Sequence, residues 1–134
     1  MSYFDIMNVA ATGMSAQRIR ITAISSNLAN AQTTKTADGG PYKRQDVVFQ
    51  TIMDGENAGG VKVKNVINDD KPPILKYEPD HPDADEEGYV AYPNVNPIEE
   101  MVNMLEASRS YEANTTVLNT AKQLALKAIE IGKA

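Results

Sequence analysis

His81 is the only histidine in the chain of 134 residues, so a catalytic triad would have to be built around it. It lies between Asp80 and Pro82 in a charged segment, and no Gly-x-Ser-x-Gly sequence that would expose a serine nucleophile occurs in the chain. The chain also has no cysteine, which excludes thiol chemistry, disulfides and cysteine-ligated metals. These residue types do not favour an enzyme.

The acidic run 83–88 is the other place where side chains could do chemistry, because its spacing resembles the start of a calcium-binding loop. The twelfth position of such a loop needs a bidentate glutamate and is here Asn94. Pro79, Pro82 and Pro93 argue against the flanking helices. A solvated acidic loop is a better interpretation than a weak cation site. No glycine-rich phosphate cradle occurs either, so we expect no metal and no cofactor.

Charge is distributed unevenly along the chain. Residues 1–31 and 96–134 carry net charges of +1 and −1, so the whole net charge of −5 belongs to residues 32–95. Nucleic-acid binding needs clustered lysines and arginines. The one small basic group, Tyr42-Lys43-Arg44, is explained equally well by the start of a strand. We therefore expect a solvated middle segment and no nucleic-acid partner.

Neither a membrane span nor a secretory signal is indicated. No apolar run approaches the roughly 20 residues that a span needs. The start of the chain lacks the basic residues and the continuous apolar stretch of a cleaved signal. We expect a cytosolic protein, or one that is exported by a route without such a signal.

The strongest pattern is a seam of residues that recurs every 3.5 positions at both ends of the chain. Such a seam stays on one face of a slightly underwound helix and requires another helix against it, so we expect the two ends to meet. The positions are Met7, Ala10, Met14, Gln17, Ile21, Ile24, Leu28 and Ala31 in the first segment, and Met104, Ala107, Tyr111, Asn114, Leu118, Ala121, Ala125 and Ala128 in the last, where Leu124 and Ile131 widen the stripe.

The first of these helices is expected over residues 3–31. Ser2 followed by Asp5 is typical of a capping box at a helix start. Gly13 interrupts the pattern and is either a weak point of the helix or a place where a neighbouring helix approaches closely. Asn27 and Asn30 are expected to end the helix, because asparagine favours turning conformations.

The second helix is expected to begin after Asn96 as its cap, with Pro97 in the first helical position, and to run to Ile131 and stop at Gly132. At about 35 residues it would exceed roughly 50 Å. So long a helix cannot be covered by a small insert. Part of its apolar face must therefore contact the first helix or another chain.

Two polar residues occupy seam positions. A buried amide at Gln17 or Asn114 would cost stability but would fix the register and the number of partners. Alternatively, both amides lie at the edge of the seam in contact with water.

Between the helices we expect loops and short strands, which gives an α+β fold that is mainly α. The two helices would pack against each other as a coiled-coil-like pair, and a small β-rich insert would lie between them in the sequence. The three segments are 1–31, 32–95 and 96–134. Alternation and turn residues predict strands over 42–49, 61–66, 74–77 and 89–92, with loops from residue 32, over 54–60 and over 78–87.

Three stretches of the chain resemble the bacterial flagellar axial proteins, which comprise the rod, hook and hook-associated proteins. The first stretch has a long segment between Thr33 and Tyr42. In this respect it is most similar to the proximal rod members of the flagellar basal-body rod family. Thr115-Thr116 departs from the family pattern on a helix surface. The stretches are 16–49, 81–96 and 99–122, and the motif residues are Asn27, Asn30, Thr33, Tyr42, Lys43 and Arg44.

The resemblance implies a non-enzymatic structural subunit of the periplasmic proximal rod, exported through the flagellar type III apparatus without a cleaved signal. The terminal helices of many subunits would form the inner tube of a torque-transmitting drive shaft around the export channel. The seam residues would then be its assembly interface, and the insert would face outward. The implied partners are copies of the chain, other rod subunits, the adaptor between the rod and the membrane ring, and the export apparatus.

Three alternatives remain open. The first is another flagellar axial subunit of the rod or hook. The second is a free-standing coiled-coil adaptor that closes its own two helices into a hairpin. An enzyme acting on peptidoglycan through Glu86 or Glu87 is the third, and it lacks any nucleophile–base pair.

Overall fold

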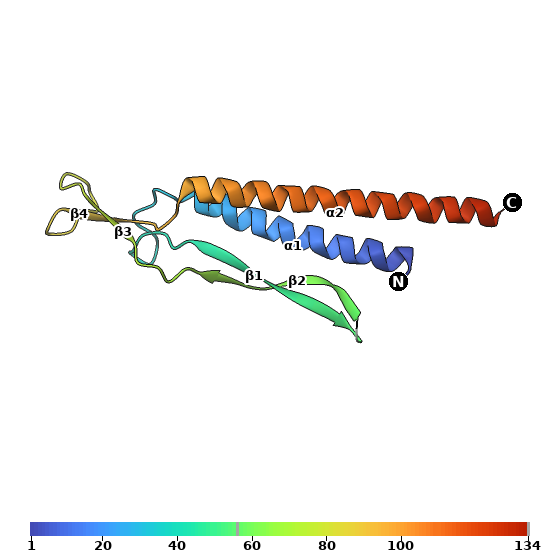
Figure 1. Ribbon diagram of the computed structural model, residues 1–134. Coiled ribbons are helices and arrows are strands. Elements are labelled where there is room, and N and C mark those ends of the chain that lie inside the picture. The colour runs from blue at the N-terminus through green and yellow to red at the C-terminus, as the bar shows by residue number, and fades with distance from the viewer. Residues whose placement is uncertain (56, 134) are drawn as a thin grey trace.

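The structure is a computed structural model that describes residues 1–55 and 57–133 (Figure 1). It is α+β and mainly α, as predicted. Figure 1 shows α1 in the middle, with α2 along one side and the β1–β2 hairpin along the other, and β3–β4 at the end away from the two termini. The elements are α1 (Tyr3–Ala29), β1 (Gln45–Asp54), β2 (Asn57–Asn68), β3 (Ile74–Tyr77), β4 (Tyr89–Tyr92) and α2 (Pro97–Gly132).

The predicted capping box begins α1. The Ser2 hydroxyl accepts the Asp5 N–H at 3.2 Å, and the Asp5 carboxylate accepts the Ser2 N–H at 2.7 Å. The hydrogen bond from the Ser2 backbone, followed by that from its hydroxyl, lowers the pKa of Asp5 below its usual value of 3.8. The ionised side chain therefore holds the first turn together.

This pKa gives a pH dependence with a defined sign. A carboxyl whose pKa is lower in the folded state contributes stability above its unfolded pKa, and that stability is lost as the pH falls through the folded pKa. We expect the first-turn amides of α1 to exchange faster with solvent as the pH falls below 3.8, after correction for the intrinsic exchange rate. The Asp5→Asn variant should lose this dependence, and an unchanged profile in that variant would contradict the assignment.

The two helices pair antiparallel along the predicted seam. Thr115 Oγ1 lies 3.8 Å from Met14 Sδ, and Arg20 forms an ion pair with Glu106 at 3.7 Å. Small side chains fill the interface, with Ala10 and Ala107 fully buried, so the helices pack closely. The pairing leaves the last turns of α2 without a facing segment of α1, as Figure 1 shows.

The two helices approach each other closely at Gly13. Of the two interpretations of this residue, the structure therefore supports the close approach of a neighbouring helix. A Cβ at Gly13 would lie 2.9 Å from Nδ2 of Asn114. Asn114 is half-buried there, and its Nδ2 donates to the Ser110 carbonyl at 3.0 Å. One turn further along, Gln17 Oε1 is buried, and no described residue donates to it. Both seam amides are thus half-buried at the interface between the helices.

Filling the Gly13 site should destabilise the helix pair. We expect Gly13→Leu to lower the free energy of unfolding by about 1–3 kcal/mol, because the side chain must displace Asn114. Ala11→Leu, at an exposed position of the same helix, is the control and should change it by less than about 0.5 kcal/mol. Asn114→Ala should recover part of the loss in the Gly13→Leu background. Equal urea midpoints for the two leucine variants would refute the close approach.

A threonine joins the β1–β2 hairpin to α1. Thr12 Oγ1 accepts the Val61 N–H at 3.1 Å and donates to the Val9 carbonyl at 2.7 Å. Gly60 sits against it with φ +133°, and a Cβ there would lie 2.5 Å from Thr12 Oγ1. The hairpin therefore contacts the helix at a glycine. Any other residue at this position would strain the backbone, because only glycine readily adopts this φ.

Several predicted boundaries were wrong. The loop predicted over 54–60 is instead the end of a hairpin: a turn at Gly55 joins strands that run to Asp54 and resume at Asn57. β1 begins at Gln45, three residues later than expected. α1 ends at Ala29, two residues earlier than expected, with Asn30 as its cap, and α2 extends one residue further than expected, through Gly132, to a cap at Lys133. The short strands β3 and β4 were predicted with their observed bounds.

Candidate functional site

Two of the residues that could have supported chemistry, His81 and Asp85, are engaged in local structure. His81 Nδ1 accepts the Asp83 N–H at 3.0 Å. In the acidic loop, Asp85 Oδ1 accepts the N–H groups of Glu87 and Tyr89, at 3.0 and 2.8 Å. Within the described residues, no three His, Asp or Glu side chains are grouped closely enough to hold a metal ion. Hydrogen bonds between the Asp85 side chain and nearby backbone N–H groups therefore fix the conformation of the acidic loop.

Asn27 lies at the centre of a buried polar node, which we define as Asn27, Tyr42, Arg44, Gln45 and Glu100. Its amide is fully buried and all of its hydrogen-bonding groups are used. Nδ2 donates to the Gln45 carbonyl at 2.8 Å and to Glu100 Oε2 at 3.0 Å. Oδ1 accepts the Gln45 N–H at 2.8 Å and the Tyr42 hydroxyl at 2.9 Å. One side chain of α1 thus joins β1, its preceding loop and α2.

Glu100 carries the charge of the node, with its side chain only 1% exposed. Its second carboxylate oxygen accepts Arg44 Nε, and Arg44 also lies 3.6 Å from Asp46. Burial alone would lower the pKa of Arg44, but the hydrogen bond to Glu100 and the surrounding carboxylates outweigh it and raise that pKa. A permanently charged guanidinium therefore neutralises the buried carboxylate.

Five of the six family-motif residues divide between the node and the turn after α1. Asn27, Tyr42 and Arg44 belong to the node, so the prediction that Asn27 ends the helix was wrong. Asn30 caps α1 and donates to the Ser26 carbonyl at 2.9 Å. Thr33 Oγ1 donates to Asn30 Oδ1 at 3.2 Å and the Thr33 carbonyl accepts the Tyr42 N–H at 3.0 Å, closing the loop 33–42. Lys43 is exposed.

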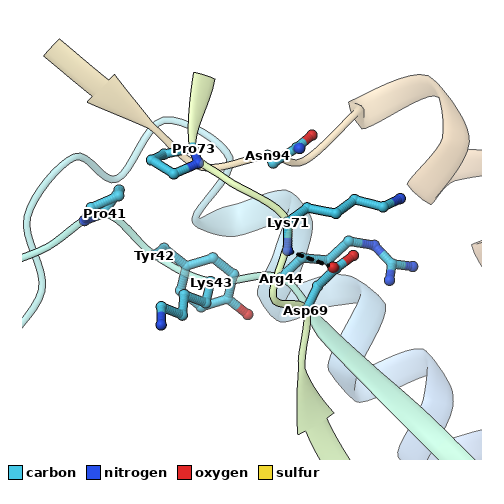
Figure 2. Close-up of a pocket in the computed structure, with 8 residues that line it drawn as sticks. All are labelled: Pro41, Tyr42, Lys43, Arg44, Asp69, Lys71, Pro73 and Asn94. Carbon is cyan, nitrogen blue, oxygen red and sulfur yellow. Dashed lines mark hydrogen bonds between the residues drawn. The ribbon is translucent and has the colours of Figure 1, made fainter. Parts of the chain in front are cut away.

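A shallow pocket lies at the outer side of the node (Figure 2). Asp69 Oδ1 accepts the Lys71 N–H at 3.0 Å, and the Asp69 N–H donates to the Arg44 carbonyl at 2.7 Å. Figure 2 shows the side chains of Lys43 and Lys71 pointing apart, so they do not converge on one anion. The pocket is a junction between the segment that precedes β1, the β2–β3 connection and the β4–α2 connection.

The seam residues differ in how far this chain covers them. Those between the two helices are covered, while the seam of α2 becomes exposed where α1 begins. Ala10, Ile24, Ala107 and Ala121 are buried; Met7, Met14, Gln17, Ile21, Leu28, Met104, Tyr111, Asn114, Leu118 and Ala125 are half-buried; and Leu124, Ala128 and Ile131 are exposed, Ile131 to 77%.

An apolar groove lies where the seam opens. It runs between the start of α1, at Tyr3 and Ile6, and the later part of α2, at Val117 and Leu124. Beyond it, α2 continues as a free helix end. Within the described residues, no helix is both long and apolar enough to span a bilayer.

Family models match both ends of the chain. Residues 7–35 match the model described as flagella basal body rod protein, and residues 86–131 match that described as flagellar basal body rod FlgEFG protein C-terminal.

Full-length relatives agree with these matches. The chain is 44% identical to the flagellar basal-body rod protein FlgC of Borreliella burgdorferi, with 98% of each chain covered. It is 46% identical to that of Salmonella typhimurium and 43% identical to that of Bacillus subtilis, and in both cases the alignment covers 99% of this chain and 100% of the relative.

Proposed function

This chain belongs to the FlgC family of flagellar basal-body rod proteins, and we propose that it forms the proximal part of the periplasmic rod, exported without a cleaved signal. As a rod protein it is a structural subunit. We further propose that it has no catalytic role. It would assemble with copies of itself and other rod subunits around the export channel, contact the adaptor at the membrane ring, and transmit torque through packing.

One observation supports assembly above the others: the open seam, which we define as Leu124, Ala128 and Ile131. These side chains continue the α1–α2 interface from the start of α1, at Leu124, to beyond it, and they are exposed. A free helix end that exposes an apolar stripe is only marginally stable in water, and packing against another helix stabilises it. In the assembled rod, helices of neighbouring subunits would cover them.

The polar node supports the mechanical part of the proposal. It ties α1, β1 and the start of α2 to one another through charge-assisted hydrogen bonds, so a load on one element passes to the others. By family analogy, the β elements would face outward and the helices would line the tube. The node would then keep the two parts in a fixed orientation under torque.

Complementation tests this proposal. A motile bacterium whose own FlgC-type rod protein is deleted should regain swimming when it carries this chain, and purified basal bodies should contain it. Normal expression without swimming, and absence of the chain from basal bodies, would count against a rod subunit.

The free-standing adaptor makes a different prediction in solution. The helix hairpin that it requires is present in the structure. An adaptor would give one species whose mass is independent of concentration. For a rod subunit, the mass of the particles should increase with concentration or when rod partners are added. Light scattering over a concentration series measures this mass.

A further inference from the structure

Outside the seam, α2 carries two apolar patches separated by a polar stretch. The start patch is Ile98, Met101, Val102 and Leu105, which are spaced so that they lie on one helical face and are 52–74% exposed. The end patch is Leu126 and Ile129, which are 51% and 53% exposed. Neither patch belongs to the seam, and the proposed assembly of the seam does not cover them.

The two patches occupy equivalent heptad positions, which in a straight α-helix drift by about 20° per heptad. Leu126 follows Ile98 by 28 residues, and Ile129 follows Met101 by the same interval, which is four heptads. At 1.5 Å per residue, the patches lie about 42 Å apart. The face between them is polar, with Arg109, Glu112 and Asn119 exposed.

The charges around the patches are opposite in sign. Between residues 97 and 112, the exposed charges are three glutamates and one arginine, a net of −2, while Glu100 is buried against Arg44. Between residues 113 and 133, there are three lysines and one glutamate, a net of +2. Glu99 and Glu106 flank the start patch, whereas Lys122, Lys127 and Lys133 flank the end patch. Each patch thus complements the other in charge as well as in apolar character.

We infer that the end patch of one copy packs on the start patch of the next copy, with their α2 helices parallel and staggered by about 42 Å. This inference rests on the proposed function, because it specifies an axial contact within the assembly. The contact is heterologous, so it propagates in one direction and does not close. The C-terminal end of one helix dipole would also meet the N-terminal part of the next, which is favourable.

The alternative arrangement is an antiparallel, two-fold dimer in which both pairs of patches meet at once. That dimer would press the polar stretch around Arg109 and Asn119 against itself and would remove it from water without matched partners. The staggered arrangement leaves the same stretch solvated. The distribution of polar residues therefore favours the stagger.

Cysteine cross-linking separates the two arrangements, and the chain has no cysteine of its own to interfere. Met101→Cys and Ile129→Cys are introduced together into the full-length chain, which is then exposed to a mild oxidant. A staggered contact gives a ladder of covalent oligomers, whereas a two-fold dimer stops at a doubly linked pair. The control Met101→Cys with Asn119→Cys places the second thiol on the polar stretch and should give no ladder.

Charge reversal provides a second readout on the same protein. Lys122→Glu with Lys127→Glu should reduce the ladder at least tenfold, and adding Glu99→Lys in the same chain should restore part of it. All three positions lie on the surface, so folding should persist and is checked by circular dichroism.

The outcomes distinguish this inference from the rod proposal. A ladder no stronger than in the Asn119 control, a product that stops at the dimer, or a ladder that ignores the charge reversals would each overturn the staggered contact. Complementation of swimming by the unmodified chain would leave the rod proposal standing in all three cases.

Discussion

Arg44→Ala is expected to lower the free energy of unfolding by about 3–5 kcal/mol, because it leaves the carboxylate of Glu100 buried without a counter-charge. A typical domain has about 5–15 kcal/mol of stability, so the loss is a large part of the total. The variant should also open the contact between α1 and α2 at Asn27, whose Nδ2 donates to the same carboxylate. Urea unfolding followed by circular dichroism measures the change.

Lys43→Ala is the matched control for this prediction. Lys43 precedes Arg44, has the same charge and belongs to the same motif, but it is exposed. We expect a change below about 0.5 kcal/mol. Replacing Glu100 by Gln in the Arg44→Ala background should recover part of the loss, because the buried charge is then gone. If Arg44→Ala and Lys43→Ala are equally stable, the node does not hold the fold together.

Ala128→Asp is expected to abolish assembly while leaving the isolated chain nearly as stable as before. Ala128 lies on the open seam beyond the start of α1 and is exposed, so the free chain has little to lose there. In the assembly, the carboxylate would be buried against a neighbouring helix without a partner, and the cost would recur at every subunit. We expect swimming to fall to the level of the deletion strain.

Ala113→Asp controls for the change in charge and helix propensity. Ala113 is also an exposed alanine of α2, but it lies off the seam. The Ala113 variant should still support swimming, and both variants should unfold at similar urea concentrations. Full swimming with Ala128→Asp would show that the open seam is not an assembly surface.

The helices and their starts could be predicted because their signals are local. Ser2, Asp5 and Asn96 act within one turn of the backbone groups that they cap, so their spacing identifies them. The seam was equally accessible, since a helical repeat places its members on one face whatever the rest of the chain does. β3 and β4 could also be predicted from local signals, because prolines close to each strand mark where it begins or ends.

The residues that were missed depend on contacts between distant parts of the sequence. Asn27 was interpreted as a turn residue because its partner Glu100 is 73 positions away, and an acidic residue in the first turn of a helix already has a local explanation. Gly60 was interpreted as part of a loop, whereas it stays in a strand to pass Thr12 of α1. No local pattern distinguishes a glycine that breaks a strand from one that admits a neighbour.

The central claim is that other subunits cover the open seam of α2 in the rod. Amide hydrogen exchange over residues 122–132, compared between the dilute chain and purified basal bodies that contain it, tests this claim most directly. We expect rapid exchange in the dilute chain, where this end of α2 has no partner, and strong protection in the basal body. Equal exchange in the two states would contradict the claim, because it would mean that no neighbour covers this part of the helix.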